Sequence, residues 1–282
     1  MRRGAALAER TTMRIGGKAE FLVEPSDEEG FAAAYAAAAR QGRPVHVLGG
    51  GSNLLVADEG VPGVVISTRR MADRHARVEG GRVFARAGTP LARLVNWAVG
   101  KGLAGLECLV GIPGTVGGAV WMNAGGRDGN IGPMVRKVTC VNEEGRLISL
   151  DAASLSWGYR RSGLTLPVVA VELELKADAP SAVAARTTET LERKLRGQPM
   201  DVASAGCFFR NPPGDNAGRL IEAAGLKGCR IGGAEVSSRH ANFLVNTGAA
   251  AAADVLALAE HVRGTVRSRF GIVLENEVCI WP

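Results

Sequence analysis

The sequence lacks paired cysteines, long uncharged runs and aromatic residues in quantity. Its five cysteines are widely spaced without a C-x-x-C motif, and its four histidines show no metal-ligand spacing. We therefore expect no disulfide framework, no bound metal and reduced thiols in the cytoplasm. No stretch reaches about 18 uncharged apolar residues, and residues 1–10 hold no apolar run of signal-peptide length, so we expect neither a membrane span nor a secretion signal.

The charge balance is mildly basic. A net charge of +6 favours anionic partners, either nucleic acid or small molecules with phosphates and carboxylates. No basic run exceeds two residues and only 5% of residues are aromatic, so we expect no nucleic-acid partner. At 282 residues, of which 46% are hydrophobic, the chain has the size and composition of a globular protein with two or three compact units.

Hydrophobic patterning predicts three units, at residues 1–68, 69–178 and 179–282. The first contains a helix at 27–41 capped by Ser26, and strands at 21–23, 45–48 and 64–67. The second contains a helix at 90–101 and strands at 82–87, 135–141, 147–150 and 168–176. Between the helix at 90–101 and the strand at 135–141, residues 102–126 contain glycine too often for a helix or a packed strand.

The third unit is predicted to contain three helices and a closing strand. The helices fall at 181–196, 216–224 and 253–269, and the strand at 272–280. The third helix carries an apolar face formed by Val255, Leu258, Val262, Val266 and Phe270.

Two glycine-rich loops are candidates for a phosphate site. Gly49-Gly50-Gly51-Ser52-Asn53 follows a buried strand, where exposed amides can converge on phosphate oxygens. A lone triple glycine is more often a tight turn, and neither loop matches a dinucleotide or P-loop motif. The second loop, Gly111–Gly118, lies on the neighbouring unit. Two such loops are able to hold the pyrophosphate of a dinucleotide between them.

Several motifs, in one order along the whole chain, resemble a known family. In the N-terminal half these are TMRIGGKA from Thr12, the triple-glycine loop and GIPGTVGGAVWMNAG from Gly111. In the C-terminal half they are AGCFFRNP from Ala205, AGRLIEAAGLKG from Ala217, HANFLVN from His240 and FGIVLENEV from Phe270. The sequence resembles the UDP-N-acetylenolpyruvoylglucosamine reductases.

The resemblance implies an α+β protein. Two α/β subdomains of the vanillyl-alcohol-oxidase (PCMH) type would bind FAD, and a C-terminal α/β domain would bind the UDP-sugar. The chain has only two tyrosines, Tyr35 and Tyr159, and residues 162–206 have none, so it resembles the shorter subtype without a tyrosine loop. The FAD-binding positions implied are Gly49, Gly50, Gly51, Ser52, Asn53, Leu54, Pro113, Gly114, Thr115, Gly117, Gly118, Asn123, Ala124 and Gly125.

The implied reaction belongs to peptidoglycan precursor synthesis. Through FAD, hydride from NADPH reduces the enolpyruvyl group of UDP-N-acetylglucosamine enolpyruvate to UDP-N-acetylmuramate, and a monomer is expected. Arg160 matches the catalytic arginine and Glu277 the catalytic glutamate. Taken alone, Arg160 and Arg161 would be a solvated pair, and Glu275 and Glu277 would share one solvent-facing side of a strand.

Two positions depart from the commoner family pattern. Cys207 stands where a serine is usual as proton donor, and a thiol, with a reference pKa of about 8.5, is the stronger acid. Taken alone, a cysteine is more often a small buried hydrophobe, which is the role expected for Cys108, Cys140 and Cys229. Cys279 stands where family members often carry a basic residue, so one substrate contact is either missing or supplied elsewhere, with Arg193 and Arg196 as candidates. Substrate contacts are implied for Tyr159, Arg210 and Asn211.

Two other functions remain open at this point. Another FAD-linked enzyme of the same fold, such as an alcohol oxidase, would keep the glycine loops but has no need of AGCFFRNP. A nucleotide-sugar sensor without activity would be expected to lose Arg160 or Glu277, and both are present.

Overall fold

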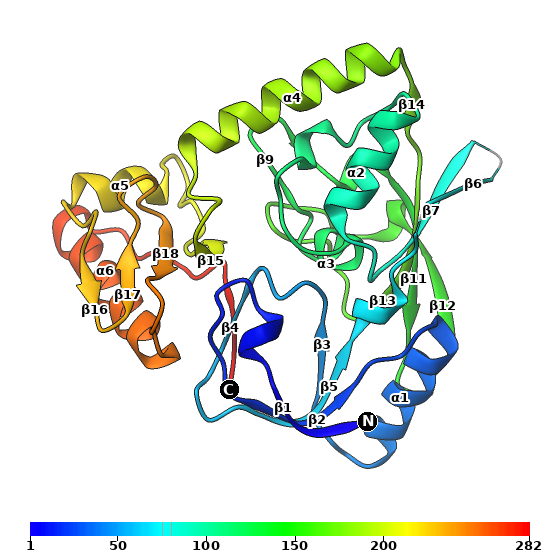
Figure 1. Cartoon of the computed structure of the whole chain (residues 1–282), viewed down its shortest axis with the longest axis horizontal. Coiled ribbons are helices and arrows are strands. Elements are labelled where there is room, and N and C mark those ends of the chain that lie inside the picture. Colours follow the sequence, from blue (N-terminus) through cyan, green and yellow to red (C-terminus); the bar gives the residue numbers. More distant parts are fainter. Residues whose placement is uncertain (75, 80) are drawn as a thin grey trace. The chain divides into compact units, whose positions relative to one another are not determined.

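The computed structural model describes residues 1–74, 76–79 and 81–282, which form two compact units (Figure 1). Unit 1 consists of residues 1–2, 21–50 and 63–194, and unit 2 of residues 3–20, 51–62 and 195–282. Each unit is therefore assembled from segments that are far apart in the sequence. The predicted division at residues 68 and 178 stays a prediction.

Unit 1 is built around a five-stranded antiparallel sheet in the order β12-β11-β13-β7-β6. These strands are Leu147–Asp151, Val135–Val141, Val168–Leu173, Arg82–Arg86 and Arg77–Glu79. A second element pairs β3 (Val45–Leu48) in parallel with β5 (Val61–Ser67). Short pairs join β8 (Leu103–Ala104) to β14 (Lys176–Ala177) and β9 (Gly125–Gly126) to β10 (Gly129–Asn130).

The helices of unit 1 are α1 (Glu28–Arg40), α2 (Leu91–Gly100), α3 (Val116–Trp121) and most of α4 (Pro180–Gly197). Helix α2 buries Leu91, Leu94, Val95 and Ala98, which recur at helical spacing and join the same core as the sheet residues. The helix predicted at 90–101 is thereby confirmed as α2.

Two expectations for unit 1 were wrong. Asp27, rather than Ser26, caps α1, because its carboxylate accepts a hydrogen bond from the Gly30 amide at 2.8 Å. The glycine-rich segment contains a helix after all, α3, capped by Thr115. Glycine is required inside it because a Cβ on Gly117 would lie 2.6 Å from the Cβ of Ala87. Close packing has outweighed the low helix propensity of glycine.

Unit 2 contains a four-stranded antiparallel sheet in the order β15-β18-β17-β16. Its strands are Ala203–Cys207, Phe243–Asn246, Ala234–Val236 and Arg230–Ile231. The helices are α5 (Ala217–Ala223) and α6 (Ala252–Phe270), and β4 (Leu54–Val56) pairs in parallel with β19 (Cys279–Trp281). Strands β1 (Arg2–Ala6) and β2 (Lys18–Val23) each contain residues of both units.

The apolar face predicted on α6 is largely confirmed. Val255, Leu258, Val262 and Val266 are fully buried, whereas Phe270 is 39% exposed at the end of the helix. The predicted closing strand at 272–280 is wrong, because only residues 279–281 form a strand. Residues 274–278 instead exchange backbone hydrogen bonds with residues 208 and 210. Across the described ranges, no helix has the length and apolarity needed to cross a bilayer.

Candidate active site

In unit 1 the two glycine-rich loops lie directly against each other. A Cβ on Gly49 would be 2.7 Å from Oγ1 of Thr115, and one on Gly50 would be 2.6 Å from Cα of Gly114. The backbones therefore approach more closely than side chains would allow. Sequence reasoning placed both loops at one cofactor, and their direct contact forms a glycine cradle to which Thr115 contributes the one side chain among these contacts, a composition that fits such a ligand.

The last three amides of the second loop are already engaged within the protein. Val116 N–H donates to the carbonyl of Thr89 at 2.9 Å, and Gly117 N–H donates to that of Ala87 at 2.9 Å. Gly118 N–H donates to Oγ1 of Thr115 at 3.4 Å. Packing against Ala87 thus accounts for Gly117 without a ligand, and its predicted contact with a cofactor stays a prediction, as does that of the exposed Pro113.

Residues 123–125 brace the same region. Asn123 is 5% exposed and has a positive φ of 44°. Its Nδ2 donates to the carbonyl of Gly158 at 2.9 Å, while its Oδ1 accepts from the Gly132 amide at 3.0 Å. Ala124 continues this bracing, since its carbonyl accepts from Ile131 N–H at 2.9 Å. The Asn123 side chain thereby anchors the turn that carries Arg160.

Arg160 stands at the tip of a tight turn. Gly158 and Arg161 exchange backbone hydrogen bonds of 2.8 and 3.2 Å across it. Arg160 has a φ of 53°, in the left-handed region that residues other than glycine adopt uncommonly. Its guanidinium lies 5.2 Å from the ring centroid of Tyr159, and its Nη1 donates to the carbonyl of Gly125 at 3.0 Å. Arg161 is exposed, as predicted.

Strained backbone at a cationic residue is a feature that functional sites share. A positive φ on a non-glycine residue occurs in the described structure at Arg14, Asn123 and Arg160. Two of these three residues were predicted as site residues from the sequence. The strain therefore marks the same region independently of the motifs.

In unit 2, Asn53 connects the end of the first glycine loop to the segment that carries Glu277. Its Nδ2 donates to the carbonyl of Glu277 at 3.1 Å, and its own carbonyl accepts from Cys279 N–H at 3.0 Å. The loop turns at Gly51, which has a φ of 63°. Leu54 is buried in β4, and Ser52 is half-buried.

Cys207 and Glu277 lie on neighbouring segments of unit 2. The amide of Glu277 donates to the carbonyl of Phe208, the residue after Cys207, at 2.8 Å. Strand β15 is irregular before Cys207, with a register shift between Ser204 and Cys207 and a φ of 80° at Gly206. Glu277 is half-buried, whereas Glu275 is exposed. The two carboxylates therefore differ in environment. Arg160 belongs to the other unit.

The side chain of Arg210 has a buried donor that an anionic ligand could satisfy. Its Nε is buried and has no hydrogen-bond partner among the described residues. A buried cationic donor left unsatisfied costs free energy that a ligand anion would recover. Asn211 is exposed, and its Oδ1 accepts from the Ala217 amide at 3.0 Å, capping α5.

One residue of this region was missed in the sequence. Asn242 is 2% exposed and pairs with both backbone groups of Phe209: its Oδ1 accepts from the amide at 2.9 Å, and its Nδ2 donates to the carbonyl at 2.7 Å. Its own carbonyl accepts from Phe208 N–H at 2.7 Å. Asn242 thereby holds the backbone next to Cys207. The signal was its place in HANFLVN.

The remaining cysteines fit a packing role to different degrees. Cys140 is fully buried in the core, and burial raises the pKa of its thiol to about 11. Burial also raises the pKa of Cys108, which is partly exposed at a cavity of unit 1. Cys229 is partly exposed and packs against the core of unit 2.

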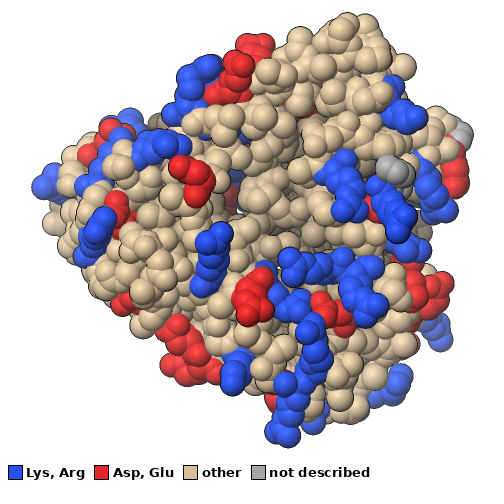
Figure 2. Space-filling view, viewed as in Figure 1, with Lys and Arg blue, Asp and Glu red and all other residues tan. Residues whose placement is uncertain are grey.

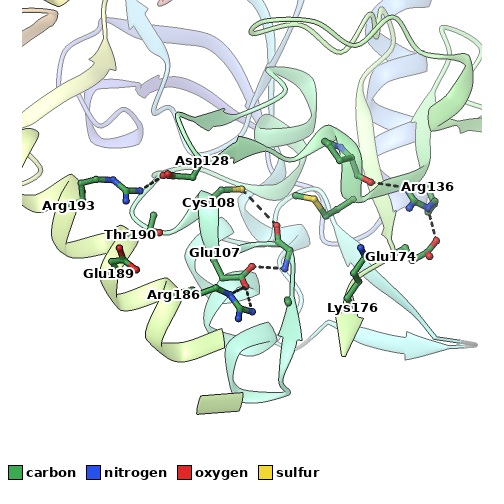
Figure 3. Close-up of a pocket in the computed structure, with 14 residues that line it drawn as sticks. Glu107, Cys108, Asp128, Arg136, Glu174, Lys176, Arg186, Glu189, Thr190 and Arg193 are labelled. Carbon is green, nitrogen blue, oxygen red and sulfur yellow. Dashed lines mark hydrogen bonds and ion pairs between the residues drawn. The ribbon is translucent and has the colours of Figure 1, made fainter. Parts of the chain in front are cut away.

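That cavity, of about 780 Å³, is lined by Arg193, named from the sequence as a candidate substitute at Cys279, and by none of the positions implied for FAD or catalysis (Figure 3). Arg186 reaches Glu107 at 2.9 Å, Arg136 reaches Glu174 at 2.7 Å, and Arg193 pairs with Asp128. These paired charges compensate one another, so the lining indicates no particular ligand. Within the described residues, no cluster of three or more His, Cys, Asp or Glu is arranged to hold a metal ion.

Comparison with known proteins covers the chain from end to end. Residues 19–151 match the FAD-binding domain family, and residues 198–281 match the C-terminal domain of UDP-N-acetylenolpyruvoylglucosamine reductase. A reductase of that name from Moorella thermoacetica is 46% identical, with 98% of this chain and 91% of the relative aligned. The second reductase so named from Symbiobacterium thermophilum is 42% identical, with 100% and 92% aligned.

A solved structure agrees with these relatives. The crystal structure of UDP-N-acetylenolpyruvylglucosamine reductase from Thermus caldophilus matches with a TM-score of 0.83 at 41% identity, covering 98% of this chain and 97% of that one. The α+β fold expected from the motifs, with an FAD-binding part of the PCMH type followed by a C-terminal domain, is thereby confirmed. The chain belongs to the UDP-N-acetylenolpyruvoylglucosamine reductase family.

Proposed function

We propose that this chain is the FAD-dependent enzyme that reduces UDP-N-acetylglucosamine enolpyruvate to UDP-N-acetylmuramate with NADPH, in peptidoglycan precursor synthesis. Family membership over the full length supports the activity. The observation that carries the residue assignment is the 2.8 Å hydrogen bond from Glu277 N–H to Phe208 O, which places the candidate acid groups on adjoining segments.

The residues available to hold FAD are those of the glycine cradle. Gly49, Gly50, Gly114 and Thr115 bring the two loops into contact with only the Thr115 side chain among them. Glycine-rich backbone of this kind can present its amides to the phosphates of a ligand. When bound, FAD supplies the redox chemistry by which hydride from NADPH is delivered to the enolpyruvyl double bond. Contacts from Gly51, Ser52, Asn53 and Leu54 are part of this proposal.

Arg160 is assigned to the substrate carboxylate. Reduction of the enolpyruvyl group builds negative charge beside this carboxylate, and a guanidinium stabilises that charge without changing its own protonation. Its bond to the Gly125 carbonyl and the ring of Tyr159 hold the guanidinium in place before the substrate arrives. Preorganisation of this kind avoids a reorganisation cost during the reaction.

Cys207 and Glu277 are assigned to proton transfer. The Cys207 thiol would donate the proton that completes reduction, since a thiol is a stronger acid than the serine hydroxyl usual at this position. Glu277, in its protonated form, would donate a hydrogen bond to the developing enolate.

The substrate anion would also meet Arg210, whose buried Nε lacks a partner, with further contacts from Asn211 and from Tyr159, which is 54% exposed. Arg193, which pairs with Asp128, stays a candidate to replace the basic residue absent at Cys279. A role for Arg196 stays part of the proposal.

The proposal also includes a small-molecule substrate, a cytoplasmic location and a monomeric enzyme. On the face drawn in Figure 2, Lys and Arg side chains are scattered, with Asp and Glu among them. This distribution favours a small anionic ligand over a polyanion, which binds best to a continuous basic stripe.

The test is the separation of the two half-reactions. The purified protein is expected to be yellow, to bleach anaerobically with NADPH, and to regain colour when the enolpyruvyl substrate is added. Cys207→Ala should bleach normally but form product at least about 100-fold more slowly, and Cys207→Ser should retain part of the rate. Normal turnover by Cys207→Ala would refute the proton-donor assignment. Bleaching without recovery on adding substrate would favour another FAD-linked oxidase.

A further inference from the structure

Arg263 of α6 forms a clamp on the backbone that leads to Glu277. Its Nε donates to the carbonyl of Leu274 at 3.0 Å, and its Nη2 donates to Oδ1 of Asn276 at 2.7 Å. Because the guanidinium is planar, these two bonds fix the relative position of the two residues that flank Glu275. The side chain is 22% exposed.

The clamped segment has little regular structure to hold it in place. Residues 274–278 belong to no strand, apart from an isolated bridge between Phe209 and Asn276. Arg210 N–H donates to the carbonyl of Glu275 at 2.8 Å, so this segment and the one after Cys207 are bonded at each end of that bridge. The side chain of Arg263 supplements those bonds.

The same guanidinium also contacts the segment that carries Cys207. It lies 5.8 Å from the ring centroid of Phe209, two residues after Cys207. Phe209 is fully buried and is held by Asn242 on its backbone. One cation therefore contacts both segments whose end residues are assigned to proton transfer.

We propose that Arg263 is a positioning residue, which sets the placement of Glu277 relative to Cys207 for the proton-transfer step. The inference rests on the roles proposed for those two residues. A small misplacement of reacting groups, of about 1 Å, is enough to cost about 100-fold in rate. Arg263 itself touches neither substrate nor cofactor in this assignment.

A purely structural ion pair is the competing explanation. Arg263 also pairs with Glu260, but the carboxylate side chain is 70% exposed. Exposed pairs contribute about 0–1 kcal/mol, so this contact explains little of the need for arginine. The bonds to Leu274 and Asn276 use two donor nitrogens of one rigid guanidinium, so lysine would not reproduce the pair.

The experiment uses the FAD-loaded enzyme and measures each half-reaction separately. Arg263→Lys is expected to slow anaerobic reoxidation by the enolpyruvyl substrate about 10- to 100-fold. Reduction by NADPH and the KM for substrate should each stay within about 2-fold, since the clamp serves only the proton-transfer groups. Asn276→Ala should show the same selective loss, and the matched control Glu260→Gln should leave both half-reactions unchanged.

The outcomes separate this inference from the proposed function. If Arg263→Lys and Asn276→Ala reoxidise at the parent rate, or slow both half-reactions equally, the positioning role is overturned. Should Arg263→Lys fail to fold, Asn276→Ala decides by the same criterion. Glu277→Gln and Cys207→Ala serve as reference variants. If Glu277→Gln and Cys207→Ala reoxidise at the parent rate, the proton-transfer roles themselves are overturned. If these two variants reoxidise slowly while the Arg263 variants reoxidise normally, only this inference is overturned.

Discussion

The turn that carries Arg160 in unit 1 and the segments that carry Cys207 and Glu277 in unit 2 are held in place by different means. Arg160 has a φ of 53° in a four-residue turn, with one buried side chain, Asn123, bonded to the base of that turn. In unit 2, Phe208 accepts from the Glu277 amide, and Asn242 pairs with Phe209 next to it.

The difference separates two ways of fixing a functional group. A non-glycine residue in the left-handed region costs about 1–3 kcal/mol, which the surrounding structure must supply. Hydrogen-bonded segments carry no such conformational cost but depend on several partners at once. Substitution in the turn should therefore separate activity from stability, whereas substitution of the unit 2 braces should lower both.

Substitution of Arg160 tests the first half of this comparison and has the largest expected effect. Arg160→Ala and Arg160→Gly should each lose about 100- to 1,000-fold in turnover, the effect of removing one preorganised donor. Both lose the guanidinium, but only alanine keeps the backbone strain. Arg160→Gly should therefore be the more stable of the two by about 1 kcal/mol in urea unfolding. Equal stability of the pair would mean that the turn is not strained.

The next largest effect is expected when Asn123, the side chain that anchors the Arg160 turn, is removed. Asn123→Ala deletes buried hydrogen bonds to the Gly158 carbonyl and the Gly132 amide. Each of the two partners left unsatisfied costs about 1–3 kcal/mol, so a loss of about 2–6 kcal/mol is expected in urea unfolding. Turnover should fall as well, because the turn loses its support. A stable variant with parent activity would show that the Arg160 turn needs no side-chain anchor.

The adjacent glycines of α3 distinguish packing from ligand contact. Gly117→Ala would place a methyl 2.6 Å from the Cβ of Ala87 and should cost about 1–3 kcal/mol of stability. The nearest atom to a Cβ on Gly118 is Oγ1 of Thr115, at 3.5 Å, so Gly118→Ala is expected to fold at least as stably as the parent. If Gly118 meets the cofactor, Gly118→Ala should still release FAD more readily on dilution. Unchanged FAD retention would remove Gly118 from the cofactor site.

Prediction from the sequence succeeds or fails along the same division between local and distant contacts. The helix at 90–101 (α2) and most of the buried face of α6 were predicted, because the signals for both lie within one segment. The two glycine loops were predicted as one site and lie in contact. Helix α3 was missed, because its Gly117 is explained by close packing against Ala87, which is distant in sequence.

The unit 2 braces were missed for the same reason. Asn242 and Arg263 act on Phe209 and Asn276 across separations of 33 and 13 residues, and no local pattern announces such a bond. The predicted strand at 272–280 failed because alternating residues alone do not show which partner the backbone will find. Sequence motifs thus identify the groups assigned to the chemistry more readily than the groups that hold them.

The smallest expected effect concerns the brace provided by Asn242. The backbone N–H of Asn242 donates to Nδ1 of His240 at 3.3 Å, so this ring nitrogen must be unprotonated. Burial lowers the pKa of His240. Lys227 opposes protonation of the ring and Glu222 favours it, while the ring packs 5.0 Å from Phe243.

The unfolded chain takes up this proton near pH 6.5, above the folded pKa, so the free energy of unfolding should fall as pH drops below about 6.5 and be flat above it. His240→Gln should reduce that slope in urea unfolding between pH 7.5 and 5.5. A residual slope is expected from His46, whose pKa burial also lowers, and His46→Gln is the matched control in unit 1. If His240→Gln leaves the slope unchanged while His46→Gln removes it, the pH-sensitive brace lies in unit 1 and the comparison between the units must be redrawn.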